Sequence, residues 1–149
     1  DLAAEALSNL GWMVGEWKAS GDGWDATTKT FWTLDGRFLT RVFTINRGGE
    51  EAPFEGAEVI GYDHTRDEIR SWTFDSEGGF GDATRTQDAN QWLVQAKATL
   101  PDGSESTAQH VFSLEDNDRF TMRSINRMVD GQALPNTDRI EAVRVQTTK

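Results

Sequence analysis

The sequence predicts an all-β protein, a single antiparallel up-and-down β-barrel of about ten strands with a short N-terminal helix. Two observations predict it. From Gly15 to Gln146, apolar residues alternate with more polar ones, which is the period of strands with one buried face. Residues that favour turns separate these stretches at intervals of roughly 8–12 residues. A sheet this long tends to close into a barrel, because closure removes its two unpaired edges.

The composition limits the possible functions. The 149 residues suffice for one domain with its own core, and we expect it to span residues 1–149. The absence of cysteine excludes disulfides, zinc–thiolate sites and thiol nucleophiles. A net charge of −10 argues against nucleic acid and anionic membrane surfaces as partners, because both attract basic proteins. Two histidines are too few for most histidine-rich metal sites; a carboxylate site stays open, but we predict no metal and no cofactor. Oligomeric state and cellular location are left open.

The first 14 residues predict a helix that caps one end of the barrel. Leu2, Leu7, Leu10 and Met13 recur near helical spacing, and Gly11 lies at or close to the end of the helix. The chain begins at Asp1 without a methionine, which indicates processing or truncation ahead of it.

The strands that follow are delimited by turn residues such as Asp35-Gly36, a strong hairpin signal. The last connection, residues 129–136, is expected to be a loop. We expect strands over residues 15–20, 24–34, 37–46, 54–62, 69–75, 80–86, 92–98, 108–114, 120–128 and 139–146.

The turns also predict registers, and registers decide which side chains share a face. In the second and third strands Trp32 faces Leu39 and Thr30 faces Arg41, and the next turn sets Phe43 against Phe54. The following registers place Leu39 opposite Glu58, Glu58 opposite Trp72, Ile60 opposite Arg70 and Trp72 opposite Asp82. Later in the chain, Val94 faces His110 and His110 faces Ser124. A one-residue error in any turn would invert a strand.

The predicted interior mixes charges with aromatic rings, which is unusual for a filled core because a buried charge is costly unless it is paired. Glu58 would lie one diagonal step from Arg41 and Arg70. Such a cluster either forms a self-satisfied ion network or binds the polar head of a ligand whose apolar body contacts the aromatics. The candidate ligand-binding residues are Arg41, Glu58, Arg70, Trp72, Phe74, Asp82, Trp92, His110, Phe112, Ser124 and Asn126.

The same residues offer limited support for catalysis. Ser124 opposite His110 suggests a nucleophile and its base, but no Gly-x-Ser-x-Gly elbow or orienting acid accompanies them. Glu58 and Asp82 are a candidate acid–base pair, although two nearby arginines would keep Glu58 ionised. We assign no catalytic residue from the sequence.

Several motifs resemble known barrel families. Gly15-Glu16-Trp17 after a short helix resembles the Gly-x-Trp first strand of the lipocalin and fatty-acid-binding (calycin) barrels. This resemblance implies that Trp17 closes the base of the barrel under an arginine of the last strand, Arg144 or Arg139. Nitrobindin-type haem barrels share a related Gly-x-Trp-x-Gly-x-Gly start, but this chain departs from it at the second glycine and has no histidine after His110, so we expect no haem.

A longer pattern, LxxLGWMVGEW followed by FEGAEVIGYDHTRDEIRSWTFDSEGGFG, is similar to a bacterial family of lipocalin-like domains of unknown function. The pattern is also attached to SnoaL-like domains. The resemblance extends from about Leu7 to Val143 and implies a barrel that binds a small molecule, with no settled activity.

Three hypotheses follow. The first is a barrel that binds a small amphipathic or anionic molecule, with Arg41 and Arg70 at its polar group. The second is a small cofactor-free enzyme, a cyclase, isomerase or hydrolase, which uses His110 with Glu58 or Asp82 in the same cavity. The third is a structural domain with a filled barrel.

Overall fold

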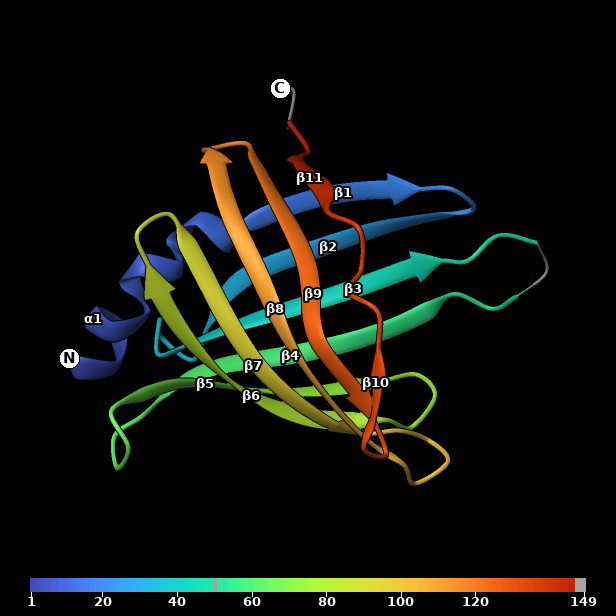
Figure 1. Cartoon of the computed structure of the whole chain (residues 1–149). Helices are drawn as coiled ribbons and strands as arrows, with labels where there is room; N and C mark the ends of the chain where they lie inside the picture. Colours follow the sequence, from blue (N-terminus) through green and yellow to red (C-terminus); the bar gives the residue numbers. More distant parts are fainter. Residues whose placement is uncertain (50, 147–149) are drawn as a thin grey trace.

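The computed structural model describes residues 1–49 and 51–146 and confirms the predicted fold (Figure 1). Ten antiparallel strands close into an up-and-down barrel. Strands β1 to β9 pair in chain order, and β11 pairs with both β9 and β1 to complete the ring. The elements are α1 (Leu2–Leu7), η1 (Ser8–Met13), β1 (Gly15–Gly21), β2 (Trp24–Thr33), β3 (Phe38–Asn46), β4 (Phe54–Asp63), β5 (Glu68–Asp75), β6 (Phe80–Asp88), β7 (Gln91–Thr99), β8 (Glu105–Asp116), β9 (Arg119–Val129), β10 (Gln132–Leu134) and β11 (Ile140–Arg144).

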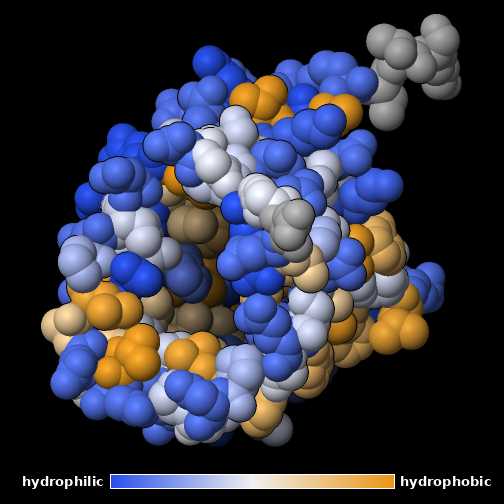
Figure 2. All heavy atoms as spheres, turned by 90° about the vertical axis from the view of Figure 1, so that its right-hand side faces the viewer, coloured by the Kyte–Doolittle hydropathy of each residue, from blue (hydrophilic) through white to orange (hydrophobic). Residues whose placement is uncertain are grey.

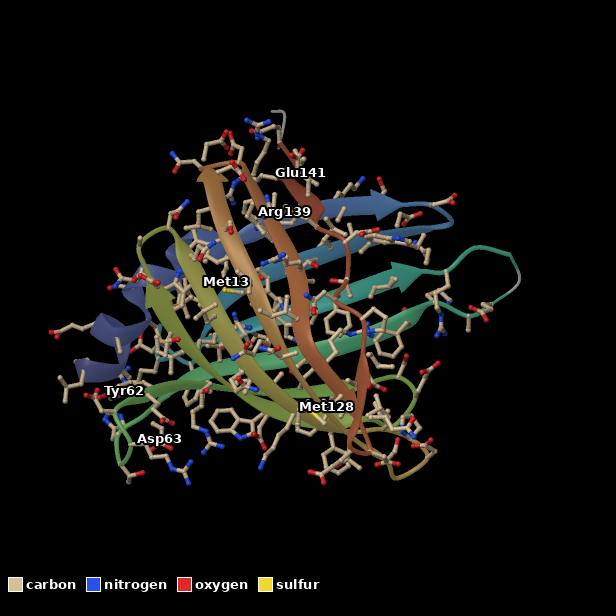
Figure 3. The ribbon with its side chains drawn as sticks, in the orientation of Figure 1. Met13, Tyr62, Asp63, Met128, Arg139 and Glu141 are labelled. Atoms are coloured by element: carbon tan, nitrogen blue, oxygen red, sulfur yellow. The ribbon has the colours of Figure 1, made fainter. Side chains whose placement is uncertain are left out.

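Strand β10 departs from the prediction, which gave a loop over residues 129–136. Its three residues pair with Arg127, Met128 and Val129 at the end of β9, beyond the part of β9 that pairs with β11. Figure 3 shows Met128 at this end of β9. Two partners therefore share one edge of β9, which a pattern of alternating residues does not reveal.

The N-terminal segment closes one end of the barrel, as predicted. The Asp1 carboxylate accepts hydrogen bonds from the amides of Ala3 and Ala4 and so caps α1. Apolar side chains of α1 and η1 pack on inward side chains of the barrel. The buried cluster consists of Leu7, Leu10, Met13, Leu39, Ile60 and Trp92. Neither helix in the described part of the chain has the length and apolarity to cross a membrane.

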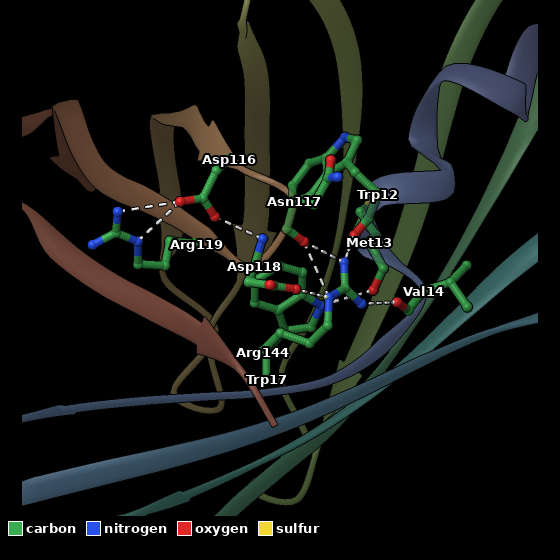
Figure 4. Close-up of polar contacts among 9 residues, drawn as sticks. All are labelled: Trp12, Met13, Val14, Trp17, Asp116, Asn117, Asp118, Arg119 and Arg144. Atoms are coloured by element: carbon green, nitrogen blue, oxygen red, sulfur yellow. Dashed lines mark hydrogen bonds and ion pairs between the residues drawn. The ribbon is translucent and has the colours of Figure 1, made fainter. Parts of the chain in front are cut away.

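Arg144 seals the same end, as the resemblance implied (Figure 4). Its guanidinium carbon lies 4.3 Å from the centre of the Trp17 ring, and Trp17 Nε1 donates to the Met13 carbonyl at 3.0 Å. Arg144 Nη2 also donates to the carbonyls of Trp12 and Asn117, at 3.0 and 2.9 Å. Arg139, the other candidate, is exposed just before β11 (Figure 3). Arg144 is therefore the last-strand arginine that covers Trp17.

The predicted registers hold in part. Trp32 pairs with Leu39 and Thr30 with Arg41, as predicted. In the next hairpin Leu39 pairs with Ile60 and not with Glu58, a shift of two residues, so that Phe43 lies opposite Gly56 and not Phe54. A shift of two leaves the same side chains on the inner face, because side chains alternate with a period of two.

The hairpin between β4 and β5 is where a register error places side chains on the wrong face. Glu58 pairs with Thr73 and Val59 pairs with Trp72, one residue away from the predicted register. The cause is the turn, in which Asp63 accepts hydrogen bonds from the amides of Thr65 and Arg66 and pairs with Glu68 across a four-residue loop. This one-residue slip turns every side chain of β5 to the opposite face.

Candidate functional site

The end of the barrel opposite α1 is hollowed (Figure 2). A pocket of about 230 Å³ lies against β7, β8 and β9. Four small inward side chains in its wall leave the barrel unfilled there, and the polar residues of the lining include His110, Arg127, Lys97 and Thr107. The small lining residues include Ala96, Ala98, Ser106 and Ala108.

A charged cluster lies inside the barrel. Glu58 on β4 is only 4% exposed and accepts hydrogen bonds from two arginines. Arg41 Nε lies 2.8 Å from Glu58 Oε1, and Arg85 Nη2 lies 2.8 Å from Glu58 Oε2. The cluster joins strands β3, β4 and β6, which are not all neighbours in the sheet.

Glu58 remains ionised in this setting. Burial alone would raise the pKa of Glu58, but the charges of Arg85 and Arg41 and their hydrogen bonds outweigh burial and hold the pKa well below its usual value. This charge pairing of Glu58 with two arginines is expected from the sequence, but Arg85 occupies the place predicted for Arg70. Glu58 therefore acts as a fixed negative charge and is unsuited to proton transfer near neutral pH.

Arg85 is the functional candidate that sequence reasoning missed. The predicted register put the wrong face of β5 inside the barrel, and with it Asp82 of the next strand. Arg85, three residues after Asp82, was therefore expected to point outward. In the structure Asp82 pairs with Trp72 on the outer face and Arg85 is 5% exposed. Ala83 is the sequence signal that would place Arg85 inside the barrel, because this small residue lies two positions before Arg85 and so shares its face of the strand.

The guanidinium group of Arg85 is only partly hydrogen-bonded. Its Nε and Nη1 atoms are buried without a hydrogen-bond partner in the described structure, and so are Ser71 Oγ and Trp92 Nε1. The guanidinium carbon lies 5.9 Å from the centre of the Phe112 ring. A buried donor without a partner is costly, so such atoms mark a place where a further acceptor is favoured.

His110 is held between this cluster and the pocket. Its Nδ1 lies 2.7 Å from Ser124 Oγ on β9, in agreement with the predicted pairing of the two residues. Burial, together with the charges of Arg85, Arg41 and Arg127, lowers the pKa of His110 below its usual value, against the opposing charge of Glu58. The imidazole is therefore neutral at pH 7, and it can accept or donate a hydrogen bond.

The structure brings six of the eleven predicted site residues to the inner face. Their positions follow from the registers, because directly paired residues share a face. The six are Arg41, Glu58, Trp92, His110, Phe112 and Ser124.

The other five are not inside, which corrects the prediction. Arg70, Trp72, Phe74 and Asp82 lie on the outer face of β5 and β6, as a consequence of the one-residue slip. There Arg70 Nη1 lies 3.5 Å from Asp63 Oδ2, and Asp63 lies at the end of β4 near α1 (Figure 3). Asn126 has a φ of 49° beside an irregularity in the β8–β9 pairing, and its amide donates to Gln109 Oε1 at the surface.

Among residues 1–49 and 51–146, no three histidine, cysteine, aspartate or glutamate side chains are grouped as metal ligands.

Comparison with known proteins adds no family to this description. No protein-family model matches the chain, and no curated protein sequence is significantly similar to it. The closed antiparallel barrel is nevertheless consistent with a calycin-like fold.

Proposed function

We propose that this protein is a binding barrel for a small anionic or amphipathic molecule. The observation that carries the proposal is Arg85, a buried arginine whose Nε and Nη1 have no hydrogen-bond partner among the described residues although Nη2 is paired with Glu58. A guanidinium presents several donors in one plane, so it can bind Glu58 with one edge and a second acceptor with another.

The charge balance of the interior supports an anion. Among the described residues, Arg41 and Arg85 share one buried carboxylate, Glu58, and Arg127 lines the pocket, whereas the whole chain has a net charge of −10. Because His110 is neutral at pH 7, it does not alter this excess of positive charge. Positive charge inside an acidic protein favours the entry and retention of a negative group.

The pocket supports a small ligand with an apolar portion. Alanines on β7 and β8 give it an apolar wall, and its 230 Å³ is less than the roughly 300–1,000 Å³ of pockets for drug-sized molecules. An open pocket of this kind also argues against the hypothesis of a completely filled barrel.

The test compares two probes that differ in charge. After native mass spectrometry of the purified protein, octanoate and octanol are titrated and followed by thermal shift and calorimetry. Octanoate is expected to bind at least tenfold more tightly, because hydrogen bonds to a charged group contribute about 1.5–3 kcal/mol. Equal affinity for the two probes, or binding of neither, would contradict an anionic ligand.

A pair of arginine variants on one strand locates the site. Arg127 lines the pocket, whereas Arg123 is exposed on the outer face of the same strand, β9. Arg127→Gln should weaken octanoate binding about tenfold, and Arg123→Gln should leave it unchanged. Arg70→Ala is a second control, because Arg70 lies on the outer face. A similar loss in all three variants would indicate screening by surface charge and not binding in the pocket.

A second candidate function is catalysis without a cofactor, which the contact between His110 and Ser124 favours. A neutral imidazole beside a hydroxyl can accept its proton. Glu58 is held ionised and Asp82 lies outside, so neither acid suggested by the sequence accompanies His110. Slow turnover of a bound ester that Ser124→Ala abolishes, with binding retained, would identify this activity.

A further inference from the structure

The outer face of the barrel has a continuous apolar surface that binding inside the barrel does not use. Two neighbouring rows of cross-strand pairs form it. One row runs Val42–Ala57–Phe74–Phe80 and the other Phe31–Thr40–Val59–Trp72, over strands β2 to β6. We call these eight residues the outer patch.

The large side chains of the outer patch are well exposed. Phe74 and Phe80 expose 58% and 53% of their surface, and Phe31 and Trp72 expose 44% and 36%. Strands β2 to β5 run side by side in one layer beneath them (Figure 1). The outer patch is therefore a broad sheet face and not a set of scattered apolar residues.

The exposed aromatic area of the outer patch is close to the apolar area that one partner buries in a standard dimer interface. With about 200 Å² per aromatic side chain, these fractions leave roughly 400 Å² of aromatic surface in water. A standard interface buries about 800 Å² on each partner, of which roughly 450–500 Å² is apolar. One outer patch thus supplies most of the apolar half of such an interface, and a second copy of the chain supplies an identical one.

The charges around the outer patch also permit a second copy. Two chains with a net charge of −10 each repel one another over most of their surfaces. The charged residues directly beside the outer patch are Lys29, Arg70 and Lys97 against Glu55 and Asp82, whereas the outward acidic residues Asp25, Asp63, Glu68 and Asp88 lie farther along the same strands. The eight residues of the outer patch carry no charge, so two copies meet there with the acidic residues left at the margin of the contact.

We infer that the protein forms a two-fold symmetric dimer in which the outer patches of two copies pack face to face, leaving both barrel mouths free. The sheets pack with nearly aligned strands, because two twisted sheets in face-to-face contact keep their strands within about 30°.

Sedimentation velocity over a concentration series tests the inference. The wild-type chain is expected to be a dimer at micromolar concentration. Phe74→Glu combined with Phe80→Glu should raise the dissociation constant at least 100-fold, because it places charges in an apolar interface. The uncharged variant Phe74→Ser should weaken the dimer in the same direction by a smaller factor. Circular dichroism checks that each variant is folded.

The matched control is Leu93→Glu. Leu93 is a 37%-exposed apolar residue on β7, outside the outer patch. It should leave the dimer unchanged. A wild-type chain that is monomeric at 100-fold higher concentration overturns the inference and leaves the patch to a different partner. A dimer that tolerates the phenylalanine variants, or that Leu93→Glu disrupts equally, also overturns it.

Discussion

Arg85 and Glu58 are bonded across the barrel interior, from β6 to β4, at a distance of 2.8 Å between Nη2 and Oε2. Their side chains are 3% and 5% exposed. Removing one member of such a buried pair leaves an uncompensated charge, whereas the intact pair contributes little to stability compared with apolar packing.

Glu58→Gln should therefore destabilise the barrel strongly. The amide keeps the shape of the carboxylate but leaves Arg41 and Arg85 without a counter-charge, so we expect a loss of about 3–5 kcal/mol in the free energy of unfolding. Urea denaturation measures this loss. Glu55→Gln, on the exposed face of the same strand, is the control and should change stability by less than about 0.5 kcal/mol.

His110 should make stability depend on pH. Burial and the nearby arginines lower the pKa of His110 below its usual 6.5 in the folded barrel. As the pH falls through 6.5, the unfolded chain takes up a proton that the folded chain does not, so stability is complete above 6.5 and decreases below it.

His110→Gln should remove this part of the pH dependence. Between pH 6.5 and about 5, its free energy of unfolding should change less with pH than that of the wild type. Urea denaturation at several pH values measures the slope. His64→Gln, in the exposed turn after β4, is the control; a wild-type slope in His110→Gln would contradict the assignment.

Arg144→Lys should weaken the closed end of the barrel. An ammonium group cannot both lie flat on Trp17 and reach the carbonyls that the guanidinium binds. We expect a loss of about 2–3 kcal/mol in stability. Thermal and urea unfolding measure it, with Arg139→Lys as the exposed control. Equal losses in both variants would show that the cover over Trp17 contributes no stability of its own.

Gly81→Ala tests how closely β6 and β7 approach. A Cβ at Gly81 would lie 2.5 Å from the Lys97 carbonyl oxygen, which is backbone and cannot rotate away. We expect a cost of about 1–3 kcal/mol, measured by urea denaturation. Gly11→Ala is the control and should be tolerated, because no atom of the described residues outside its immediate surroundings lies within 4 Å of the added Cβ.

The sequence was sufficient to predict the barrel because strand alternation and turn residues are local signals. It predicted the closing helix, and the resemblance to calycin barrels implied the Arg144–Trp17 contact. The interior depended on turn geometry. One hydrogen-bonded turn at Asp63 shifted the β4–β5 register by one residue, moved Arg70 and Asp82 outside and brought Arg85 inside.

Errors of this kind differ in their consequences. The two-residue shift between β3 and β4 changed partners but kept Arg41 and Glu58 on one face, so half of the charged cluster was still predicted. Asn126 was lost for another reason, since an irregularity in pairing interrupts the alternation within β9. Neither the exact turn length nor such an interruption is encoded in the apolar pattern.

The pairings of β11 with β1 and β9, which close the barrel, are shorter than the other pairings between neighbouring barrel strands. Strand β11 contributes three residue pairs to β1 and four to β9, whereas β2 and β3 share nine. β11 is also the last of these strands to leave the ribosome, so during synthesis the outer edge of β1 and residues 119–122 of β9 remain unpaired until it emerges, whereas β10 covers the other end of β9 earlier. The order of synthesis therefore makes ring closure a late event, and the partly made sheet is the form in which this protein is most exposed to edge-to-edge aggregation.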